Sequence, residues 1–456
     1  MTEDVDGHIH DKFDLQKRLG KGAYGIVWKA VDRRTKEVIA LKKIFDAFRN
    51  NTDAQRTFRE VMFLQEFGKH PNIIKLYNIF RADNDRDIYL IFEYMEADLH
   101  NVIKKGTILK DVHKQYIMCQ LFRAIRFLHS GNVLHRDLKP SNVLLDADCR
   151  VKLADFGLAR SLSSKMPDLT EYVATRWYRS PEILLAAKQY TKGVDMWSLG
   201  CILAEMLIGR ALFPGSSTIN QIERIMNTIS KPSRADIASI GSYYAASVLE
   251  KMPQNPRKPI ESIISSSSPA VDMIQRLLIF APHKRMNVEQ CLVHPYVVQF
   301  HNPSEEPVLS YEVNLPLPDH VQLQVDDYRN ELYRLISEKK MNAQKIHHER
   351  IPPVTRDQSR APIAQAECSD TDYDTARSLA RAVSVDKNAS SHESSSGTLR
   401  ERAQSADSRS SKEGSSSVKK SNFSTKERRR SIERAKLFAN MAPSKLLHSH
   451  KLISNY

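Results

Sequence analysis

The sequence predicts an α+β fold with a small antiparallel, β-rich lobe, a larger helical lobe and a disordered tail. Short apolar runs separated by Gly-rich or charged turns fill the first part of the chain, which is typical of antiparallel strands. Beyond Asp98, apolar residues recur at three- and four-residue steps, which indicates helices. After about Lys340, Ser, Arg and Lys replace the apolar residues. These changes of pattern mark the boundaries of the three parts.

The first lobe begins at Phe13, after a short N-terminal extension over residues 1–12. We expect strands over residues 13–19, 25–31, 37–41, 73–80 and 88–94. Residues 52–67 place apolar side chains on one side and charges on the other, so they predict an amphipathic helix.

The second lobe is predicted from longer periodic segments. We expect helices over residues 114–129, 194–208, 219–229, 269–279 and 287–294. Turns are predicted at Gly209, at residues 213–215 and at Pro282, since Gly and Pro interrupt regular structure.

The tail over residues 341–456 carries much of the chain's positive charge. The whole chain has a formal net charge of +14, and the tail contains 21 Lys and Arg against 13 Asp and Glu. Such a Ser-rich segment buries too little apolar area to offset its ordering entropy, so we expect a disordered regulatory tail. Residues 431–447 keep scattered apolar side chains that fit a short helix on a regulatory protein. Because the charge is concentrated in the tail, we expect no direct binding of nucleic acid.

The cysteine spacing and the N-terminal residues indicate in which cellular compartment the protein is expected. Five cysteines are scattered without paired spacing, which favours a reducing environment over disulfides or zinc. The first residues lack the pattern of a signal peptide, and no run of 18 apolar residues occurs. We therefore expect the cytoplasm or nucleus and no transmembrane segment.

A glycine-rich turn with Gly20, Gly22 and Gly25 joins the first two predicted strands. Missing side chains let backbone amides approach phosphates. Taken alone, the pattern fits a plain hairpin turn as well as a phosphate loop. A Rossmann site is disfavoured, because a strand and not a helix follows the last glycine.

An unusual charge lies in the third predicted strand, where Lys42 follows Ile-Ala-Leu. A cation in an apolar strand needs a partner. Glu60, on the helix that follows, is the natural candidate. Taken alone, a strand-edge lysine that reaches solvent is the simpler interpretation.

The segment His135-Arg-Asp-Leu-Lys-Pro-Ser-Asn142 combines a candidate base, a cation and a metal-binding amide within eight residues. Asp155-Phe-Gly157 and then Ser180-Pro-Glu182 follow it. In this order the motifs resemble those of protein kinases. The resemblance implies the bilobal eukaryotic protein kinase fold over residues 13–340, with lobes at 13–95 and 96–300 and an extension over 301–340 that returns to the small lobe.

The resemblance to kinases also assigns roles. Asp155 and Asn142 are expected to bind Mg²⁺, Asp137 to accept the substrate's hydroxyl proton, and Lys139 to neutralise the transferred phosphoryl group. Lys42 and Glu60 are expected to hold the phosphates of ATP. The residues that the resemblance places around ATP are Leu19, Gly20, Lys21, Gly22, Ala23, Gly25, Val27, Ala40, Lys42, Phe92, Glu93, Met95 and Asp98. Arg285 is expected to pair with Glu182, and Asp195 to support the fold.

The segment Thr170-Glu-Tyr172 through Glu182 resembles the activation lip of mitogen-activated protein kinases of the extracellular signal-regulated type. Two activating phosphorylations, at Thr170 and Tyr172, are thereby implied. A phosphate orders a loop only where arginines can bind it. The arginines expected to clamp the two phosphates are Arg56, Arg59, Arg136 and Arg160 for Thr170, and Arg176 and Arg179 for Tyr172.

The same resemblance implies substrates with Ser or Thr followed by Pro. The acidic docking patch of the family appears with Asn302 where an aspartate is usual, so we expect weak recruitment by basic docking peptides. The long basic tail is similar to that of an atypical, long-tailed subgroup whose members tend to phosphorylate their own Thr-Glu-Tyr. We therefore expect self-activation, a monomer, and location in the cytoplasm, the nucleus and at cilia or centrioles.

Two alternative interpretations of the sequence differ in the residues they require. Cyclin-dependent-kinase-like and ciliary relatives also carry Thr-x-Tyr in this lip, but residues 55–60 favour the mitogen-activated branch. A pseudokinase scaffold would lack Lys42, Asp137 or Asp155, and all three are present.

Overall fold

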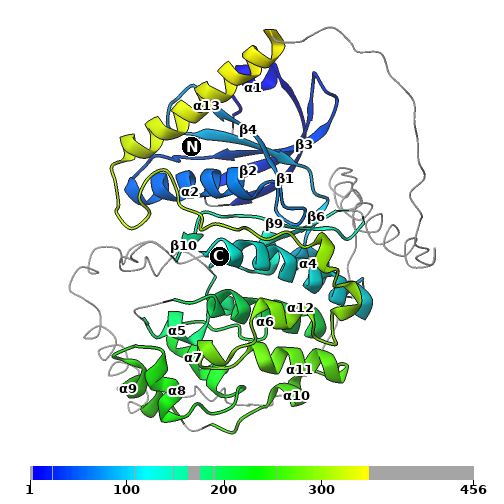
Figure 1. Ribbon diagram of the computed structural model, residues 1–456, viewed down its shortest axis with the longest axis vertical. Coiled ribbons are helices and arrows are strands. Elements are labelled where there is room, and N and C mark those ends of the chain that lie inside the picture. Colours follow the sequence, from blue (N-terminus) through cyan, green and yellow to red (C-terminus); the bar gives the residue numbers. More distant parts are fainter. Residues whose placement is uncertain are drawn as a thin grey trace, which may run out of the picture. The chain divides into compact units, whose positions relative to one another are not determined.

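In the computed structural model, the N-terminal part of the chain forms a five-stranded antiparallel sheet, as predicted (Figure 1). The strand order is β1-β2-β3-β5-β4. The strands are β1 (Phe13–Gly22), β2 (Gly25–Asp32), β3 (Val38–Ile44), β4 (Leu76–Arg81) and β5 (Ile88–Glu93). β1 is longer than predicted, because its pairing with β2 continues past two irregularities as far as Gly22 opposite Gly25. The glycine-rich turn is therefore the end of a hairpin.

The segment before β1 packs on this sheet. Helix α1 (Gly7–His10) buries Ile9 against the side chains of Phe13 and Tyr89. The buried ammonium of Lys43 donates to the backbone oxygen of Asp4 at 2.7 Å and lies 3.3 Å from the Asp87 carboxylate. Residues 4–12 are thus part of the folded small lobe.

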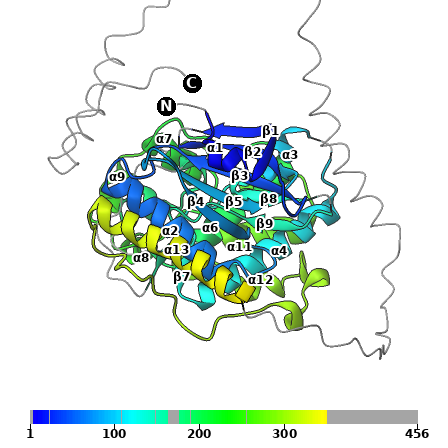
Figure 2. The same cartoon turned by 90° about the horizontal axis from the view of Figure 1, so that it is seen from above.

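Helix α2 (Asn51–Phe67) follows β3, as the amphipathic pattern predicts. The Asn50 side chain caps it by accepting from the backbone nitrogen of Asp53 at 2.9 Å. Helix α13 (Val325–His348) lies beside α2, as both views show (Figure 1 and Figure 2). Tyr328 of α13 packs on Phe58 of α2, with ring centroids 5.5 Å apart. The chain therefore does return to the small lobe, and its last helix extends past the predicted boundary at residue 340.

The second lobe is helical. Its longest helices match the predicted periodic segments, and the most buried of them is α6, which ends at Gly209 in the left-handed conformation with φ 75°. The helices are α3 (Leu99–Lys104), α4 (Asp111–Ser130), α5 (Pro181–Leu184), α6 (Gly193–Ile208), α7 (Thr218–Met226), α8 (Arg234–Ser239), α9 (Ala245–Glu250), α10 (Ile260–Ile263), α11 (Ser268–Leu277) and α12 (Val288–Leu292).

Five short strands lie close to the junction of the lobes, and the sequence did not predict them because two or three residues are too few to show a period. They form two small antiparallel sheets, one of which pairs β10 with β7. These strands are β6 (Ala97–Asp98), β7 (Val133–Leu134), β8 (Val143–Leu145), β9 (Val151–Leu153) and β10 (Arg160–Ser161).

The structure describes residues 4–22, 24–106, 108–146, 148–162, 175–187, 190–253 and 255–348, all within the compact unit of residues 1–394. Ala23, Thr170, Tyr172 and the tail from residue 349 lie outside the described residues. Among the helices within these ranges, none has the length and apolar character needed to cross a membrane. The four cysteines of the same ranges are buried and free of disulfides.

Candidate active site

The catalytic loop lies between β7 and β8 and brings three predicted residues into contact. The Lys139 ammonium is 2.7 Å from the Asp137 carboxylate. The side-chain nitrogen of Asn142, which ends the 3₁₀ helix η1 (Pro140–Asn142), donates to the same carboxylate at 3.0 Å. Because the nitrogen of that amide is used in this way, its oxygen is the atom suited to a metal ion. The loop therefore presents a carboxylate, an ammonium and an amide oxygen together.

Asp195, at the start of α6, holds this loop in place through hydrogen bonds to its backbone. Its fully buried carboxylate accepts from the backbone nitrogens of His135 at 3.0 Å and Arg136 at 2.9 Å. His129 of α4 lies 3.0 Å from the same carboxylate. Burial would raise the pKa of Asp195, but these hydrogen bonds and the neighbouring histidines outweigh it and hold that pKa below its usual range. The predicted supporting role of Asp195 thus consists in holding the backbone of the catalytic loop.

Lys42 and Glu60 are brought together as predicted, with 2.6 Å between the Lys42 ammonium and a Glu60 carboxylate oxygen. Burial would lower the pKa of Lys42, but the carboxylates of Glu60 and Asp155 outweigh it, and the pKa is raised. The lysine is therefore positively charged at neutral pH, as a phosphate-binding group must be.

Asp155 completes the group of charges. It lies 3.7 Å from the guanidinium of Arg56 and has φ 63°, a conformation that non-glycine residues adopt at a cost of about 1–3 kcal/mol. Burial would raise the pKa of Asp155, but Lys42 and Arg56 hold it below its usual range. For Asp137 the direction is opposite, because burial dominates over the charge of Lys139 and raises the pKa. Two carboxylates with divergent pKa values are typical of sites where they have different tasks.

The glycine-rich loop covers open space. A Cβ atom built on Gly20 or Gly22 would meet nothing within 4 Å, whereas one on Gly25 would lie 2.1 Å from the backbone oxygen of Lys43. Gly25 is therefore required for packing of the sheet. Gly20 and Gly22 are not, which leaves room for phosphates against the backbone of this hairpin.

The remaining residues predicted around ATP lie on the sheet and on the segment after it. Ala40, Phe92 and Met95 are buried, and Leu19 and Val27 are partly buried against the same core. The Glu93 carboxylate accepts from the backbone nitrogen of Lys75 at 2.7 Å.

Asp98, predicted to bind the ribose, caps helix α3 in the structure. Its two carboxylate oxygens accept from the backbone nitrogen of Asn101 at 2.8 Å and from the side-chain nitrogen of that residue at 2.5 Å. Its role toward a ribose stays a prediction.

The arginines predicted to clamp phospho-Thr170 separate into two places. Arg59 and Arg160 meet at Asp319, whose Oδ1 accepts from each of them at 2.5 Å. Arg136 is close enough to lower the pKa of this carboxyl, although burial dominates and raises it. Arg56 instead lies by Asp155 and over the ring of Tyr24.

Sequence reasoning did not identify Asp319. A lone acid in the otherwise apolar stretch Leu315-Pro-Leu-Pro-Asp319 was the signal that could have drawn attention to it.

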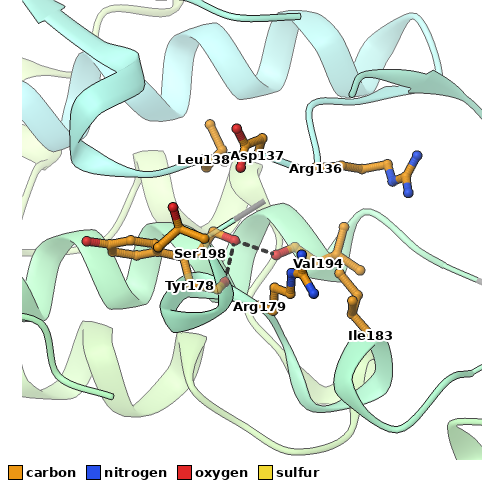
Figure 3. Close-up of a pocket in the computed structure, with 9 residues that line it drawn as sticks. Arg136, Asp137, Leu138, Tyr178, Arg179, Ile183, Val194 and Ser198 are labelled. Atoms are coloured by element: carbon orange, nitrogen blue, oxygen red, sulfur yellow. Dashed lines mark hydrogen bonds between the residues drawn. The ribbon is translucent and has the colours of Figure 1, made fainter. Parts of the chain in front are cut away.

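A small pocket lies beside the catalytic loop. Figure 3 shows Asp137 and Leu138 across from Tyr178 and Ser198, with Arg136 and Arg179 at one side. Its other lining residues are Thr175, Ile183 and Val194. Arg176 lies in the adjoining 3₁₀ helix η2 (Arg176–Tyr178), and its Nε is buried without a hydrogen-bond partner among the described residues.

The predicted docking patch contains less free charge than its sequence indicates. The side chain of Glu306 is 1% exposed, and its carboxylate contacts Arg123 at 3.1 Å, His301 at 2.8 Å and Arg126 at 3.5 Å. Its charge is therefore neutralised by contacts within the fold. Weak recruitment by docking peptides stays a prediction.

Phosphoryl transfer needs positioning and charge neutralisation more than covalent chemistry. The charged groups between the two lobes are arranged for that task, and the class of enzyme that this fold and site define is the protein kinase. Residues 13–297 match the family model described as Protein kinase domain.

Comparison with known proteins shows which protein kinases the chain is similar to. The chain is 80% identical to "Mitogen-activated protein kinase 15" of Caenorhabditis elegans over the full length of both proteins. It is 62% identical to "Mitogen-activated protein kinase 15" of Xenopus laevis, over 76% of this chain and 60% of that protein. It is 54% identical to "Extracellular signal-regulated kinase 2" of Dictyostelium discoideum, over 75% of this chain and 95% of that protein.

The chain belongs to the mitogen-activated protein kinase family, and within it to the long-tailed mitogen-activated protein kinase 15 type. It is a protein serine/threonine kinase, so its substrates are proteins. These matches favour the mitogen-activated branch over the cyclin-dependent-kinase-like alternative.

Proposed function

We propose that this kinase uses Mg²⁺ and ATP to phosphorylate Ser or Thr residues that precede Pro, and that it activates itself by phosphorylating Thr170 and Tyr172. The observation that carries the proposal is the convergence of the Lys42–Glu60 pair, at 2.6 Å, with Asp155 and the Asp137–Lys139 pair, at 2.7 Å. These five side chains are of the types that phosphoryl transfer requires, namely cations that bind phosphate and carboxylates that accept a proton or bind a metal ion.

In the proposed reaction, the terminal phosphoryl group of ATP moves to a hydroxyl oxygen of the substrate, and its bond to the β-phosphate oxygen breaks. Asp137 accepts the hydroxyl proton, and ADP leaves. Lys42 holds the phosphates, with Glu60 keeping it in place, and Lys139 neutralises the transferred group. The donor set of Asp155 and the Asn142 oxygen suits Mg²⁺, a hard cation that prefers oxygen ligands and neutralises phosphate charge when bound.

The pocket beside Asp137 supports the proline preference. Leu138, Ile183, Val194 and Tyr178 give it apolar walls next to the position of the accepting hydroxyl. Proline brings an apolar ring and no backbone N–H that would need a partner. A peptide library with every residue after the acceptor tests this preference, and equal rates for all of them would contradict it.

Phosphate binding is proposed for two groups of arginines. Arg59 and Arg160 meet at Asp319 with Arg136 nearby, Arg179 lines the pocket beside the catalytic loop together with Arg136, and Arg176 lies in the adjoining η2; charge-assisted bonds to phosphate are strong. The phosphorylated residues Thr170 and Tyr172 lie outside the described residues, so their binding rests on the family resemblance.

Self-activation is tested with purified bacterial protein incubated with Mg²⁺ and ATP. We expect phosphate on Thr170 and Tyr172 by mass spectrometry, and none on an Asp137→Asn control. Equal phosphate on both proteins would contradict self-activation. Activation of the wild type only after an upstream kinase is added would favour an ordinary cascade.

The last part of the proposal concerns the partners of the tail and the cellular location of the protein. We propose that the basic tail binds regulatory proteins and that the kinase acts as a monomer in the cytoplasm, the nucleus and at cilia or centrioles. A fluorescent fusion with and without residues 349–456 tests this. Identical distribution of the two forms would contradict a targeting role for the tail.

A further inference from the structure

The segment over residues 306–324 connects both lobes before α13 begins. On the large lobe, the backbone nitrogen of Leu309 donates to the Ser130 hydroxyl at 2.8 Å, and that of Val313 donates to the Gly131 oxygen at 2.9 Å. On the small lobe, the side chain of Gln55 in α2 donates to the Val321 oxygen at 3.4 Å. Asp319 lies between these anchor points, so its position is fixed from both sides.

The carboxylate of Asp319 joins two elements of the catalytic machinery. Its Oδ1 accepts from Arg59 of α2 and from Arg160 of β10, each at 2.5 Å, and Arg160 also donates to the backbone oxygen of Asp319 at 3.2 Å. The side chains of Arg59 and Asp319 are both only 5% exposed. Buried, charge-assisted bonds of this kind hold their partners firmly.

The position of Arg59 makes this contact relevant to catalysis. Arg59 directly precedes Glu60 on α2, so an anchor on one side chain limits the rotation of the helix that directs the other. Arg160 follows Asp155 by five residues and lies in β10, which pairs with β7 just before the catalytic loop. The carboxylate of Asp319 therefore connects helix α2, which carries Glu60, with strand β10, which follows Asp155 in the chain.

The charges around Asp319 are not balanced. Among the described residues, the carboxylate of Asp319 contacts both Arg59 and Arg160, and Arg136 lies at longer range between this carboxylate and that of Asp195. Arg59 Nη2 and Arg136 Nε are buried without hydrogen-bond partners among the described residues. The cluster therefore retains donors for a second or more highly charged anion, and a phosphate carries nearly two charges and three acceptor oxygens.

We propose that Asp319 is a positioning residue for the kinase reaction: its carboxylate bridges Arg59 and Arg160 and so keeps Glu60 on Lys42 before any phosphate binds to these arginines. This inference rests on the proposed activation by phosphorylation at Thr170. A phosphate on that residue takes over the task of the carboxylate. Asp319 then matters most for the unphosphorylated enzyme, which is the form that must start self-activation.

The test compares the full-length wild type with Asp319→Asn, Asp319→Glu and, as matched control, Asp326→Asn. Asp326 is an exposed carboxylate of the same extension whose side chain is 70% exposed. Each protein is assayed after phosphatase treatment and again after stoichiometric phosphorylation of Thr170 by an added kinase. Initial rates give kcat and KM, calorimetry gives the Kd for Mg²⁺ with a non-hydrolysable ATP analogue, and thermal unfolding checks the fold.

For the phosphatase-treated enzyme, we expect Asp319→Asn to lower kcat/KM about tenfold and to weaken binding of the analogue. After phosphorylation, the same variant is expected to come within about twofold of the wild type. Asp319→Glu should keep part of the activity, and Asp326→Asn should behave as the wild type in both states.

Three results would overturn the proposal: unchanged activity and analogue binding in the phosphatase-treated variant, higher activity of that variant, or an equal loss in both phosphorylation states. An equal loss would show a merely structural role. The proposed function fails in a different way, namely if phosphorylation of Thr170 does not activate the wild type. The comparison of phosphatase-treated proteins stays decisive for Asp319 in that case.

Discussion

The buried ion pair between Glu182 and Arg285 allows the sharpest prediction about stability. The predicted pair is bidentate, with two bonds of 2.7 Å, and the side chains are 1% and 0% exposed. Arg285 also donates to the backbone oxygens of Ile279, Gly193 and Phe280 at 2.7–2.8 Å. Every N–H group of this guanidinium is therefore used, and Arg285→Ala leaves one carboxylate and three carbonyl groups without their donor.

Removal of one partner of a buried ion pair costs about 3–5 kcal/mol, and unsatisfied buried carbonyls add about 1 kcal/mol or more. We expect Arg285→Ala to lower the free energy of unfolding by about 5 kcal/mol, a large part of the 5–15 kcal/mol typical of a domain. The melting temperature should fall by roughly 10 °C or more. Arg285→Lys should recover only part of this loss, because an ammonium cannot form the bidentate contact.

The assay is thermal and urea unfolding of the kinase and its variants. Arg276→Ala is the matched control: it breaks an exposed pair with Asp272, whose side chains are 61% and 42% exposed, and should cost less than about 0.5 kcal/mol. The double variant Glu182→Met, Arg285→Met removes both charges and should cost less than the sum of the two single changes. A loss for Arg285→Ala no larger than that of the control, or strictly additive losses in the double variant, would refute the reasoning.

Three further outcomes are expected. Glu60→Gln should lower kcat/KM about a hundredfold with little change in stability, since it removes the charge that holds Lys42 at 2.6 Å; an unchanged KM and kcat in steady-state assays would speak against this. Burial lowers the pKa of His70 to about 4, so protons bind the unfolded state more readily and stability should fall by about 1.4 kcal/mol per pH unit below about 6.5. Unfolding at pH 7.5 and 5.5 measures this, and His70→Asn should reduce the difference in stability between these two pH values by about 1.4 kcal/mol, while the buried His135, whose pKa is also lowered, still contributes. Gly25→Ala should cost about 2 kcal/mol because its Cβ would lie 2.1 Å from a backbone oxygen, whereas Gly22→Ala should leave the melting temperature unchanged.

Much of the fold followed from local patterns of the sequence. The amphipathic segment predicted over residues 52–67 is α2 at Asn51–Phe67, and the periodic segment over residues 194–208 is α6 at Gly193–Ile208. Long segments with one apolar face specify their structure almost alone. The two- and three-residue strands at the junction of the lobes are held by their pairing partners, so they carry no such local signal.

The catalytic residues were easier to predict than the surroundings of their arginines. Asp137 and Asn142 belong to one short motif whose order has a chemical reason, and the structure brings them within 3.0 Å of each other. Asp319 reaches Arg59 across 260 positions of sequence, through a segment with neither helical nor strand period. Contacts between irregular segments and distant helices depend on the assembled fold. A single sequence has no local pattern from which such contacts can be predicted.

Two buried aspartates hold the catalytic machinery in different ways. Asp195 binds backbone N–H groups of the catalytic loop, which carry no net charge and are available in every state of the enzyme. Asp319 binds two guanidinium groups, which any anion with more charge can bind more strongly. The loop that carries Asp137 is therefore held by contacts that need no counter-charge, while the helix that carries Glu60 is held by an ion pair for which a phosphate would compete. If phosphorylation activates this kinase as proposed, we expect it to act on the alignment of Lys42 by Glu60 and to leave the position of Asp137 unchanged.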